Sequence, residues 1–175
     1  MDTFDAIATK LDVREYAADR KVPSDVKLKV LEAGRLTGSG MNSQHWRFIL
    51  VNGKDSLKQL AKDSTTGQWV ANCDFAVIVL TDPKLGFHLI DAGRVIQDMQ
   101  LAAWNYGVAS RVFTGISIEN LRKDFDIPKQ LEPTIVAGFG YPSRNITGKK
   151  KNRSALEEVA FLEKFGNELD PNKLN

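Results

Sequence analysis

The sequence predicts a single α+β domain in which helices flank a mixed β-sheet. Short apolar runs typical of strands alternate with segments of helical periodicity, and this alternation favours a mixed α/β or α+β sheet. Residues 76–80 show no polar alternation, which is typical of a central strand covered on both faces. Residues 88–106 carry apolar side chains at helical spacing, and they form the longest helix that the sequence predicts.

The first half of the chain contains four predicted elements. Residues 2–9 have the pattern of a short helix, and a second helix opens at Ser24, a plausible N-cap, and continues to Gly34. Residues 46–51 are aromatic and β-branched, which predicts a strand that ends at an Asn-Gly turn signal. A helix over residues 54–62 follows this turn.

The long predicted helix is rich in small residues, and its apolar surface extends around much of its circumference. Ala92, Gly93 and Ala103 would allow a second helix to approach closely, so we expect several neighbours to bury this helix. Gly107 is its stop signal. The remaining predictions are a strand at 109–113, a helix at 118–125, a strand at 134–139, and an ambiguous segment at 155–165.

Composition limits the classes of function. The chain has 175 residues, of which 42% are hydrophobic and 26% charged, as expected for one compact domain over residues 1–175 or for a dimer that shares its core. A net charge of +2 is too small to indicate wholesale nucleic-acid or membrane binding. The single cysteine, Cys73, excludes an intramolecular disulfide and a multi-cysteine metal site within one chain, and we expect it in the core.

No transmembrane or secretory pattern is recognisable in the sequence. The longest apolar run, residues 75–80, is far shorter than the roughly 20 residues that a membrane-spanning helix needs. The first residues lack a basic region followed by an apolar block, so a cytoplasmic location is the default expectation.

Several familiar catalytic motifs are missing. Gly138-Phe139-Gly140 lacks the third glycine and the following βαβ unit of a dinucleotide fingerprint, so we interpret it as the end of a strand. The spacings of a P-loop and of a nucleophile elbow do not occur. With only His45 and His88, metal catalysis is disfavoured, and structural roles are expected for both histidines.

The stretch of residues 38–48 is the most informative, because a small polar loop runs directly into an apolar strand. Ser39 and Gly40 would let the backbone approach a ligand closely. Asn42 and Gln44 offer carboxamides that both donate and accept hydrogen bonds, which suits a flat polar ligand such as a flavin. The alternative is that these are ordinary turn residues after a helix.

Two cationic groups could serve a ligand phosphate. Lys10 and Arg14 lie near the N-terminus, and Lys151 and Arg153 lie in a dense basic cluster near the C-terminus. Charge-assisted bonds from lysine and arginine to a phosphate are strong, although either group could equally be solvated surface charge.

In the order of its motifs the chain resembles the nitroreductase family of FMN enzymes. One block runs from Lys10 to Tyr16, and a second is Ser-Gly-Met-Asn-Ser-Gln-His-Trp at residues 39–46. The third is the small-residue helix, and the fourth is Lys-Asn-Arg at residues 151–153. The resemblance implies an α+β, nitroreductase-like mixed sheet with a long central helix at a dimer interface.

The resemblance also implies the residues that hold the phosphate end of FMN. Lys10, Lys151 and Arg153 would bind the phosphate through their positive charge. Arg14 would lie near the pyrimidine edge, where a guanidinium stabilises the negative charge that accumulates on reduction.

Further residues would contact the flavin ring. Ser39, Gly40 and Asn42 would reach the flavin held mainly by the partner chain. Gly115 matches the position where a backbone N–H approaches N5, and Gln68 resembles a ring-contacting position. No protein side chain is expected to act as a catalytic nucleophile, because the cofactor carries the redox chemistry.

The activity implied by the resemblance is ping-pong hydride transfer. NADH or NADPH would reduce the flavin, and a nitroaromatic, a quinone or a similar conjugated acceptor would then take its place. The implied assembly is a homodimer with flavin at the subunit interface, in which the C-terminal tail embraces the other subunit. No nucleic-acid or membrane partner is expected.

The chain departs from the family pattern in three respects, and two other functions stay open. Asp12 stands where a serine often helps to bind phosphate, His45 replaces the usual proline, and the chain is short. One alternative is a specialised flavin enzyme of the same family that performs dehydrogenation, dehalogenation or flavin degradation. The other is a flavin-free module that binds anions or nucleic acid.

Overall fold

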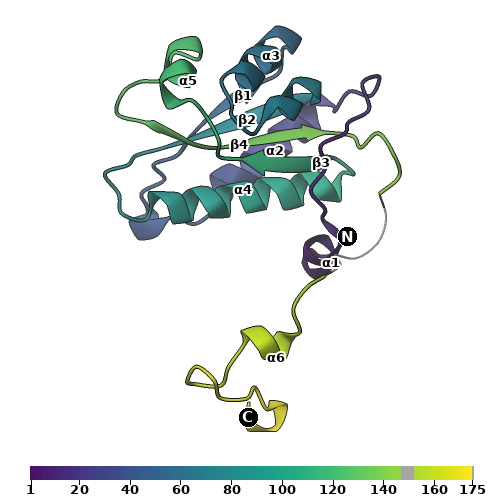
Figure 1. The fold of residues 1–175 in the computed structure, drawn as a ribbon, viewed down its shortest axis with the longest axis vertical. Coiled ribbons are helices and arrows are strands. Elements are labelled where there is room, and N and C mark those ends of the chain that lie inside the picture. Colours follow the sequence, from purple (N-terminus) through teal and green to yellow (C-terminus); the bar gives the residue numbers. More distant parts are fainter. Residues whose placement is uncertain (147–151, 175) are drawn as a thin grey trace.

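Four strands form one sheet in the order β1-β2-β4-β3 in the computed structural model, which describes residues 1–146 and 152–174 (Figure 1). All pairings between these strands are antiparallel. In the described part of the chain, parallel pairing is limited to a bridge between Asp12 and Ser110. The strands are β1 (Arg47–Val51), β2 (Phe75–Thr81), β3 (Ala109–Phe113) and β4 (Glu132–Gly140).

Helices cover both faces of the sheet, which confirms the predicted α+β class (Figure 1). One face packs against α2 (Ser24–Leu36) and α4 (His88–Asn105). The other packs against α3 (Lys54–Lys62), α5 (Ile118–Asp124) and the short 3-10 helix η2 (Gln68–Asn72). The helix α4 also contacts α1 (Thr3–Thr9), so several neighbours bury it as its composition predicts.

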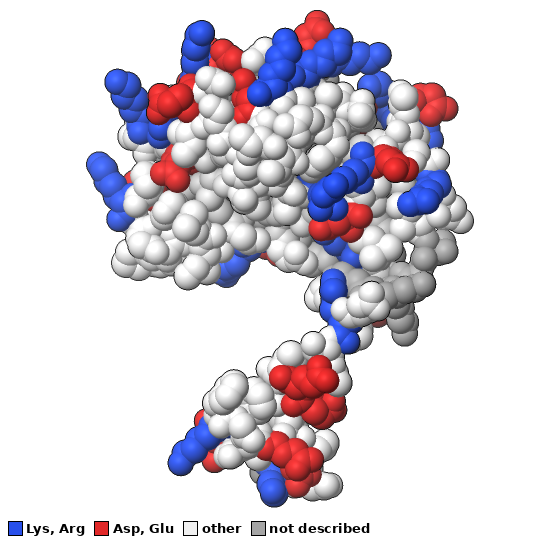
Figure 2. Space-filling view, in the orientation of Figure 1, with Lys and Arg blue, Asp and Glu red and all other residues white. Residues whose placement is uncertain are grey.

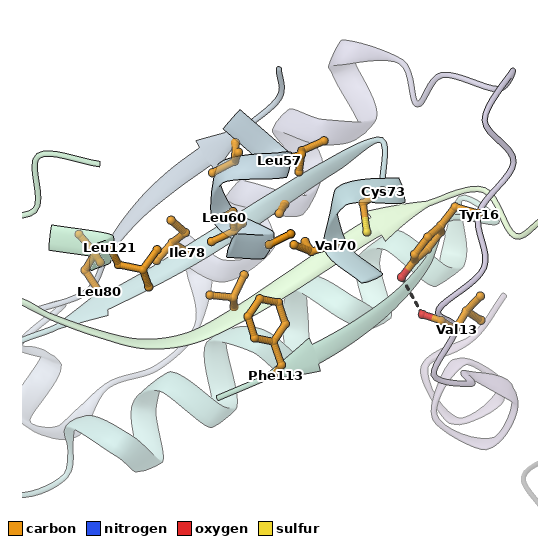
Figure 3. Close-up of a cluster of buried hydrophobic side chains, with 14 of the residues drawn as sticks. Val13, Tyr16, Leu57, Leu60, Val70, Cys73, Ile78, Leu80, Phe113 and Leu121 are labelled. Carbon is orange, nitrogen blue, oxygen red and sulfur yellow. Dashed lines mark hydrogen bonds between the residues drawn. The ribbon is translucent and has the colours of Figure 1, made fainter. Parts of the chain in front are cut away.

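The strand β2 separates two apolar clusters, and all of its residues are buried. Phe75, Val77 and Val79 point into the cluster with α2 and α4. Ala76, Ile78 and Leu80 belong to the opposite cluster, drawn in Figure 3 with side chains from α3, η2 and α5. Because both faces are covered, this strand needs no polar alternation, which confirms the central position predicted for it.

Two details at the ends of α2 differ from the sequence prediction. The helix continues past Gly34 to Leu36, because Gly34 packs inside it against α4. A Cβ atom at this position would lie 2.2 Å from Met99 Cε. At the other end, Pro23 occupies the N-cap position, and Ser24 is the first helical residue.

The C-terminal segment leaves the body of the protein as an extended tail (Figure 1). The ambiguous stretch 155–165 contains one short helix, α6 (Leu156–Val159), and a 3-10 helix, η3 (Pro171–Lys173), follows. Leu156, Val159 and Phe165 are exposed on this tail. Within the described ranges, no helix has the length and apolar character needed to cross a bilayer.

A buried carboxylate joins the N-terminal region to the start of β2. Asp74 lies 2.7 Å from Lys27 Nζ and 3.0 Å from Lys21 Nζ, and it accepts the Val22 N–H at 3.2 Å. Burial by itself would raise the pKa of the Asp74 carboxyl, but hydrogen bonds from Lys27 and Lys21 outweigh it and lower the pKa below its usual 3.8. Its neighbour Cys73 is buried as expected, and this burial raises the pKa of its thiol.

We expect Asp74→Asn to lower the free energy of unfolding by about 3 kcal/mol at neutral pH, because Lys27 would keep its charge without a carboxylate partner. A lowered folded-state pKa means that the ionised carboxylate stabilises the fold above its unfolded pKa, and that this contribution disappears as pH falls through the folded value. The difference between the two proteins in urea unfolding should therefore shrink below about pH 4.

The matched control for this measurement is Asp25→Asn, which removes an exposed carboxylate 3.9 Å from Lys29. Exposed pairs contribute little to stability, so its effect should be far smaller. Equal effects of the two substitutions would contradict the role assigned to Asp74.

Candidate functional site

The N-terminal segment contacts the edge strand β3 near the start of that strand, at Ser110 (Figure 1). Asp12 bridges to Ser110, and the Val13 N–H donates to the Ser110 carbonyl at 3.1 Å. Lys10 is nearly buried, and its ammonium group forms an ion pair with Asp12 at 2.5 Å. Asp12, which stands where the family often has a serine, is therefore paired with Lys10, and its negative charge does not face a ligand phosphate without a partner.

A small hollow beside this segment carries two arginines. The hollow has a volume of about 110 Å³, and its lining includes Asp12, Arg14, Glu15, Arg144 and Ile146. Ile146 is the last described residue before the basic cluster. Lys151 lies outside the described residues. Arg153 is exposed, and among the described contacts no ion pair joins it to the N-terminal segment.

At the far end of β3, two loops are paired. The Thr65 N–H donates to the Gly115 carbonyl at 2.8 Å, and Ser64 forms an antiparallel bridge with Ile116. The Gln68 carboxamide donates to the Ser64 carbonyl at 2.9 Å, which holds the exposed Gln68 side chain on this loop. Gln68 and Gly115 are thus brought to the same end of β3.

Gly115 is required by the packing of these loops. A Cβ atom at this position would lie 2.4 Å from Thr66 Oγ1 and 2.6 Å from Thr65 Oγ1. The sequence prediction attributes this glycine to the close approach of a ligand, whereas the loop pairing is by itself a sufficient reason for it.

Four of the predicted residues therefore lie along one edge of the sheet. Lys10 and Arg14 lie at the start of β3, whereas Gln68 and Gly115 lie beyond its end. The strand rise of about 3.3 Å per residue separates Ser110 from Gly115 by about 17 Å. An elongated ligand with an anionic end and a flat polar end matches this arrangement.

The other predicted group, in residues 38–44, is attached to the start of α4. We call these residues the site loop. The Gly40 N–H donates to Asp91 Oδ2 at 3.0 Å, and Asp91 lies in the first turn of α4. His45 Nε2 lies 3.2 Å from the same oxygen, and Arg94 lies 3.4 Å from Asp91 Oδ1.

The backbone of the site loop adopts an unusual conformation. Met41, Asn42 and Gln44 have φ values of 53°, 52° and 46°, in the left-handed region that favours glycine. Such residues cost on the order of 1–3 kcal/mol each and persist only where the surroundings fix them. Ser39 Oγ accepts the Gln44 N–H at 3.0 Å, and the Gln44 carboxamide donates to Asn42 Oδ1 at 3.2 Å.

Both glycines of the site loop are explained by packing against α4 and the residue before it. A Cβ atom on Gly40 would lie 2.7 Å from the Phe87 ring, and one on Gly38 would lie 2.7 Å from Arg94 Nη2. The small residues thus allow the loop to lie close to the helix. The exposed side chains of Asn42 and Gln44 remain available to a ligand.

Within one chain, the site loop lies far from Lys10 and Arg14. Trp104, near the end of α4, donates to Thr9 Oγ1 at 3.0 Å, so the last turns of this helix lie beside the segment that carries Lys10. At about 1.5 Å per residue, α4 separates Asp91 from Trp104 by about 20 Å. The structure therefore does not bring Ser39, Gly40 and Asn42 to Lys10 and Arg14 within one chain.

Two residues of these regions were not identified as functional from the sequence. Arg144 follows a Pro-Ser turn, and its basic side chain close to the C-terminal cluster was the available signal. Asp91 is an acidic residue in the first turn of an otherwise apolar helix, and it is only 2% exposed. The sequence position of Asp91 does not identify its partners, because Gly40 and His45 lie far away in sequence.

The face that carries α4 is uncharged over a broad area (Figure 2). Leu89 and Ile90 at the start of α4 are 61% and 67% exposed, and Tyr106 at its end is also exposed. Exposed apolar surface of this extent is typical of a protein–protein contact.

Comparison with known proteins places the chain in one family. A model of the nitroreductase family matches residues 7–86. A protein of Methanothermobacter thermautotrophicus, named as a candidate NADH dehydrogenase/NAD(P)H nitroreductase, is 32% identical over 154 residues, which cover 83% of this chain and 80% of that protein. A protein of Archaeoglobus fulgidus with the same name is 31% identical over 146 residues, which cover 78% of this chain and 83% of that protein.

Solved structures share the fold. A nitroreductase family protein from Clostridium difficile 630 has a TM-score of 0.82 and 27% identity, over 94% of this chain and 99% of that chain. An FMN-dependent nitroreductase from Clostridium difficile R20291 has a TM-score of 0.84 and 19% identity, over 93% of this chain and 100% of that chain. The second likeness concerns the fold alone.

Because the Cβ atom would collide with Thr65 and Thr66, we expect Gly115→Ala to lower the free energy of unfolding by about 1–3 kcal/mol. Chemical denaturation measures this change. Gly86→Ala is the matched control, since a Cβ atom there meets nothing within 4 Å. If Gly115→Ala were as stable as Gly86→Ala, the packing explanation for Gly115 would be wrong.

Proposed function

Because this chain belongs to the nitroreductase family, we propose that it is an FMN-dependent oxidoreductase that uses NADH or NADPH to reduce nitroaromatic, quinone or similar conjugated acceptors. The observation that carries the proposal is the arrangement along β3, with Lys10 and Arg14 at one end and Gln68 and Gly115 at the other. The names of the archaeal relatives and of the Clostridium difficile R20291 enzyme support the choice of electron donor and cofactor.

The cationic end of this edge fits a phosphate. Asp12 neutralises the charge of Lys10, so a phosphate dianion needs further cations, and Arg144 in the same hollow as Arg14 supplies one. We assign Lys10, Lys151 and Arg153 to the phosphate. Charge-assisted hydrogen bonds from these groups would hold it more strongly than neutral donors could.

The polar end fits a flavin ring. When bound, FMN supplies the two-electron chemistry, because hydride from the nicotinamide enters and leaves through it. From the cationic end of the edge, Arg14 would reach the pyrimidine side of the ring, where its fixed positive charge stabilises negative charge. The Gln68 carboxamide can donate and accept hydrogen bonds, and the backbone at Gly115 would lie against N5.

The complete site would require two copies of the chain. The site loop lies at the start of α4, and Lys10 and Arg14 lie near its end. An antiparallel contact between the α4 helices of two protomers would bring the site loop of one chain to the β3 edge of the other. Gly93 favours this contact, because it is exposed and a Cβ atom there meets nothing within 4 Å.

The tail offers a second contact between the protomers. Its apolar side chains Leu156, Val159 and Phe165 are exposed in the single chain, and burying them on the partner would stabilise a dimer. This arrangement corresponds to a tail that embraces the other subunit.

The first prediction concerns FMN binding. The purified protein should bind FMN with a flavin absorbance spectrum, and NADH or NADPH should bleach this absorbance without oxygen. A protein that neither binds added FMN nor is stabilised by it would contradict the proposed function. If FMN binds but neither nicotinamide bleaches it, the choice of electron donor is wrong while the cofactor assignment stands.

A second prediction concerns the phosphate. Lys151→Ala combined with Arg153→Ala should lower FMN affinity at least tenfold, because a charge-assisted hydrogen bond contributes about 1.5–3 kcal/mol. Titration of flavin fluorescence measures the change. The matched control removes two exposed lysines elsewhere, with Lys123→Ala and Lys129→Ala, and should leave the affinity near that of the unchanged protein. Equal affinities for the two double variants would reject the phosphate role.

A third prediction tests the contribution of the partner chain. Asn42→Ala and Arg14→Glu should each weaken FMN binding when both subunits carry the change. In a mixed dimer of the two variants, one site would combine an unchanged β3 edge with an unchanged site loop, so tight binding should return at one site per dimer. If the site loop contacted the flavin bound by its own chain, each site of the mixed dimer would carry one substitution and both would bind FMN weakly. Titration of separately tagged and purified mixed dimers distinguishes the two outcomes.

A further inference from the structure

We propose that His45 and Asp91 are positioning residues that hold the site loop in its ligand-binding conformation. The inference rests on the proposed function, in which this loop contacts the partner's flavin. It concerns a buried pair of side chains that would not touch the cofactor themselves.

The Asp91 carboxylate contacts the site loop, His45 and Arg94. It is 2% exposed, and Oδ2 accepts the Gly40 N–H at 3.0 Å while also lying 3.2 Å from His45 Nε2. Arg94, on the same helix, lies 3.4 Å from Oδ1. A buried carboxylate needs such donors, so Asp91 and the site loop fix each other's position.

The geometry defines which nitrogen of His45 carries a proton. The backbone N–H of Asp82 points to Nδ1 at 3.3 Å, and a backbone N–H can only donate, so Nδ1 accepts. Nε2 must therefore carry the proton and donate to Asp91. The ring also packs edge-on against Phe87, with a centroid distance of 6.0 Å. His45 thus connects the end of β2 to α4 and to the site loop.

The site loop depends on such external contacts. The left-handed residues Met41, Asn42 and Gln44 are unfavourable in isolation, and they persist only where neighbouring groups fix the backbone. Among the described residues, the backbone–backbone hydrogen bonds of the loop are internal, from the Asn42 and Ser43 N–H groups to the carbonyls of Ser39 and Gly40. Internal bonds do not orient the loop relative to α4, whereas the bond from Gly40 to Asp91 does.

The experiment compares substitutions of this pair with a matched histidine. His45→Phe keeps an aromatic ring but removes both hydrogen bonds, and His45→Gln retains a side-chain N–H that can donate to Asp91. Asp91→Asn removes the carboxylate acceptor. The control is His88→Phe, because His88 also lies at the start of α4 and makes one side-chain hydrogen bond, to Thr81 at 2.9 Å, but does not bond to the site loop.

The first readout is hydrogen exchange of the Gly40 amide in the flavin-free protein. We expect exchange to be at least tenfold faster in His45→Phe and Asp91→Asn, near the unchanged rate in His45→Gln, and unchanged in His88→Phe. The second readout is FMN affinity, which should fall at least tenfold in the first two variants. The loss of thermal stability in His45→Phe and Asp91→Asn should be similar to the loss in His88→Phe.

The outcomes separate this inference from the proposed function. If Gly40 exchange in His45→Phe stays within twofold of the unchanged protein, the inference is wrong. It is also wrong if exchange accelerates while FMN affinity holds, because the loop would then not serve the site. If the unchanged protein binds no FMN, the proposed function fails, and with it the ligand-binding part of the inference. Should His45→Phe fail to fold, Asp91→Asn compared with His45→Gln provides the same test.

Discussion

The burial of β2 on both faces is the constraint on which the rest of the structure depends. Its alternate side chains fill two apolar clusters, so helices must cover both faces of the sheet. With β2 and β4 in the middle, β3 is left at an edge. An edge strand has free backbone groups, and the N-terminal segment uses them at Ser110. The position of Lys10 therefore depends on the burial of β2, a strand that is remote from Lys10 in sequence.

The length of α4 divides the candidate site into two parts. Asp91 at its beginning holds the site loop, and Trp104 near its end contacts the segment that carries Lys10. A rigid helix cannot shorten the distance of about 20 Å between them. The same helix exposes apolar side chains and a glycine to solvent. In the proposed dimer, a second copy of the chain would cover this apolar face and bring the two parts of the site together.

Two acidic residues show how charge is handled around the candidate site. Asp12 is paired with Lys10, and Asp91 is surrounded by Gly40, His45 and Arg94. Asp91 is buried, where a carboxylate without a partner would be costly, whereas in the other pair Lys10 is the buried member and Asp12 is exposed. They act differently, since Asp12 reduces the positive charge offered to an anion while Asp91 fixes a backbone conformation.

Local sequence was sufficient for the class of the fold and for most elements, because apolar periodicity records which side of a strand or helix is buried. It also grouped Lys10 with Arg14 and selected the site loop. It failed at Gly34, where contact with Met99 rather than a helix stop explains the glycine, and it gave no partner for His45, which meets Asp91 46 residues later. Such partners depend on how helices pack on the sheet, which periodicity does not contain. The sequence by itself therefore determined the elements and the residue types suited to a flavin, whereas the tertiary structure decided which of them lie together on one chain.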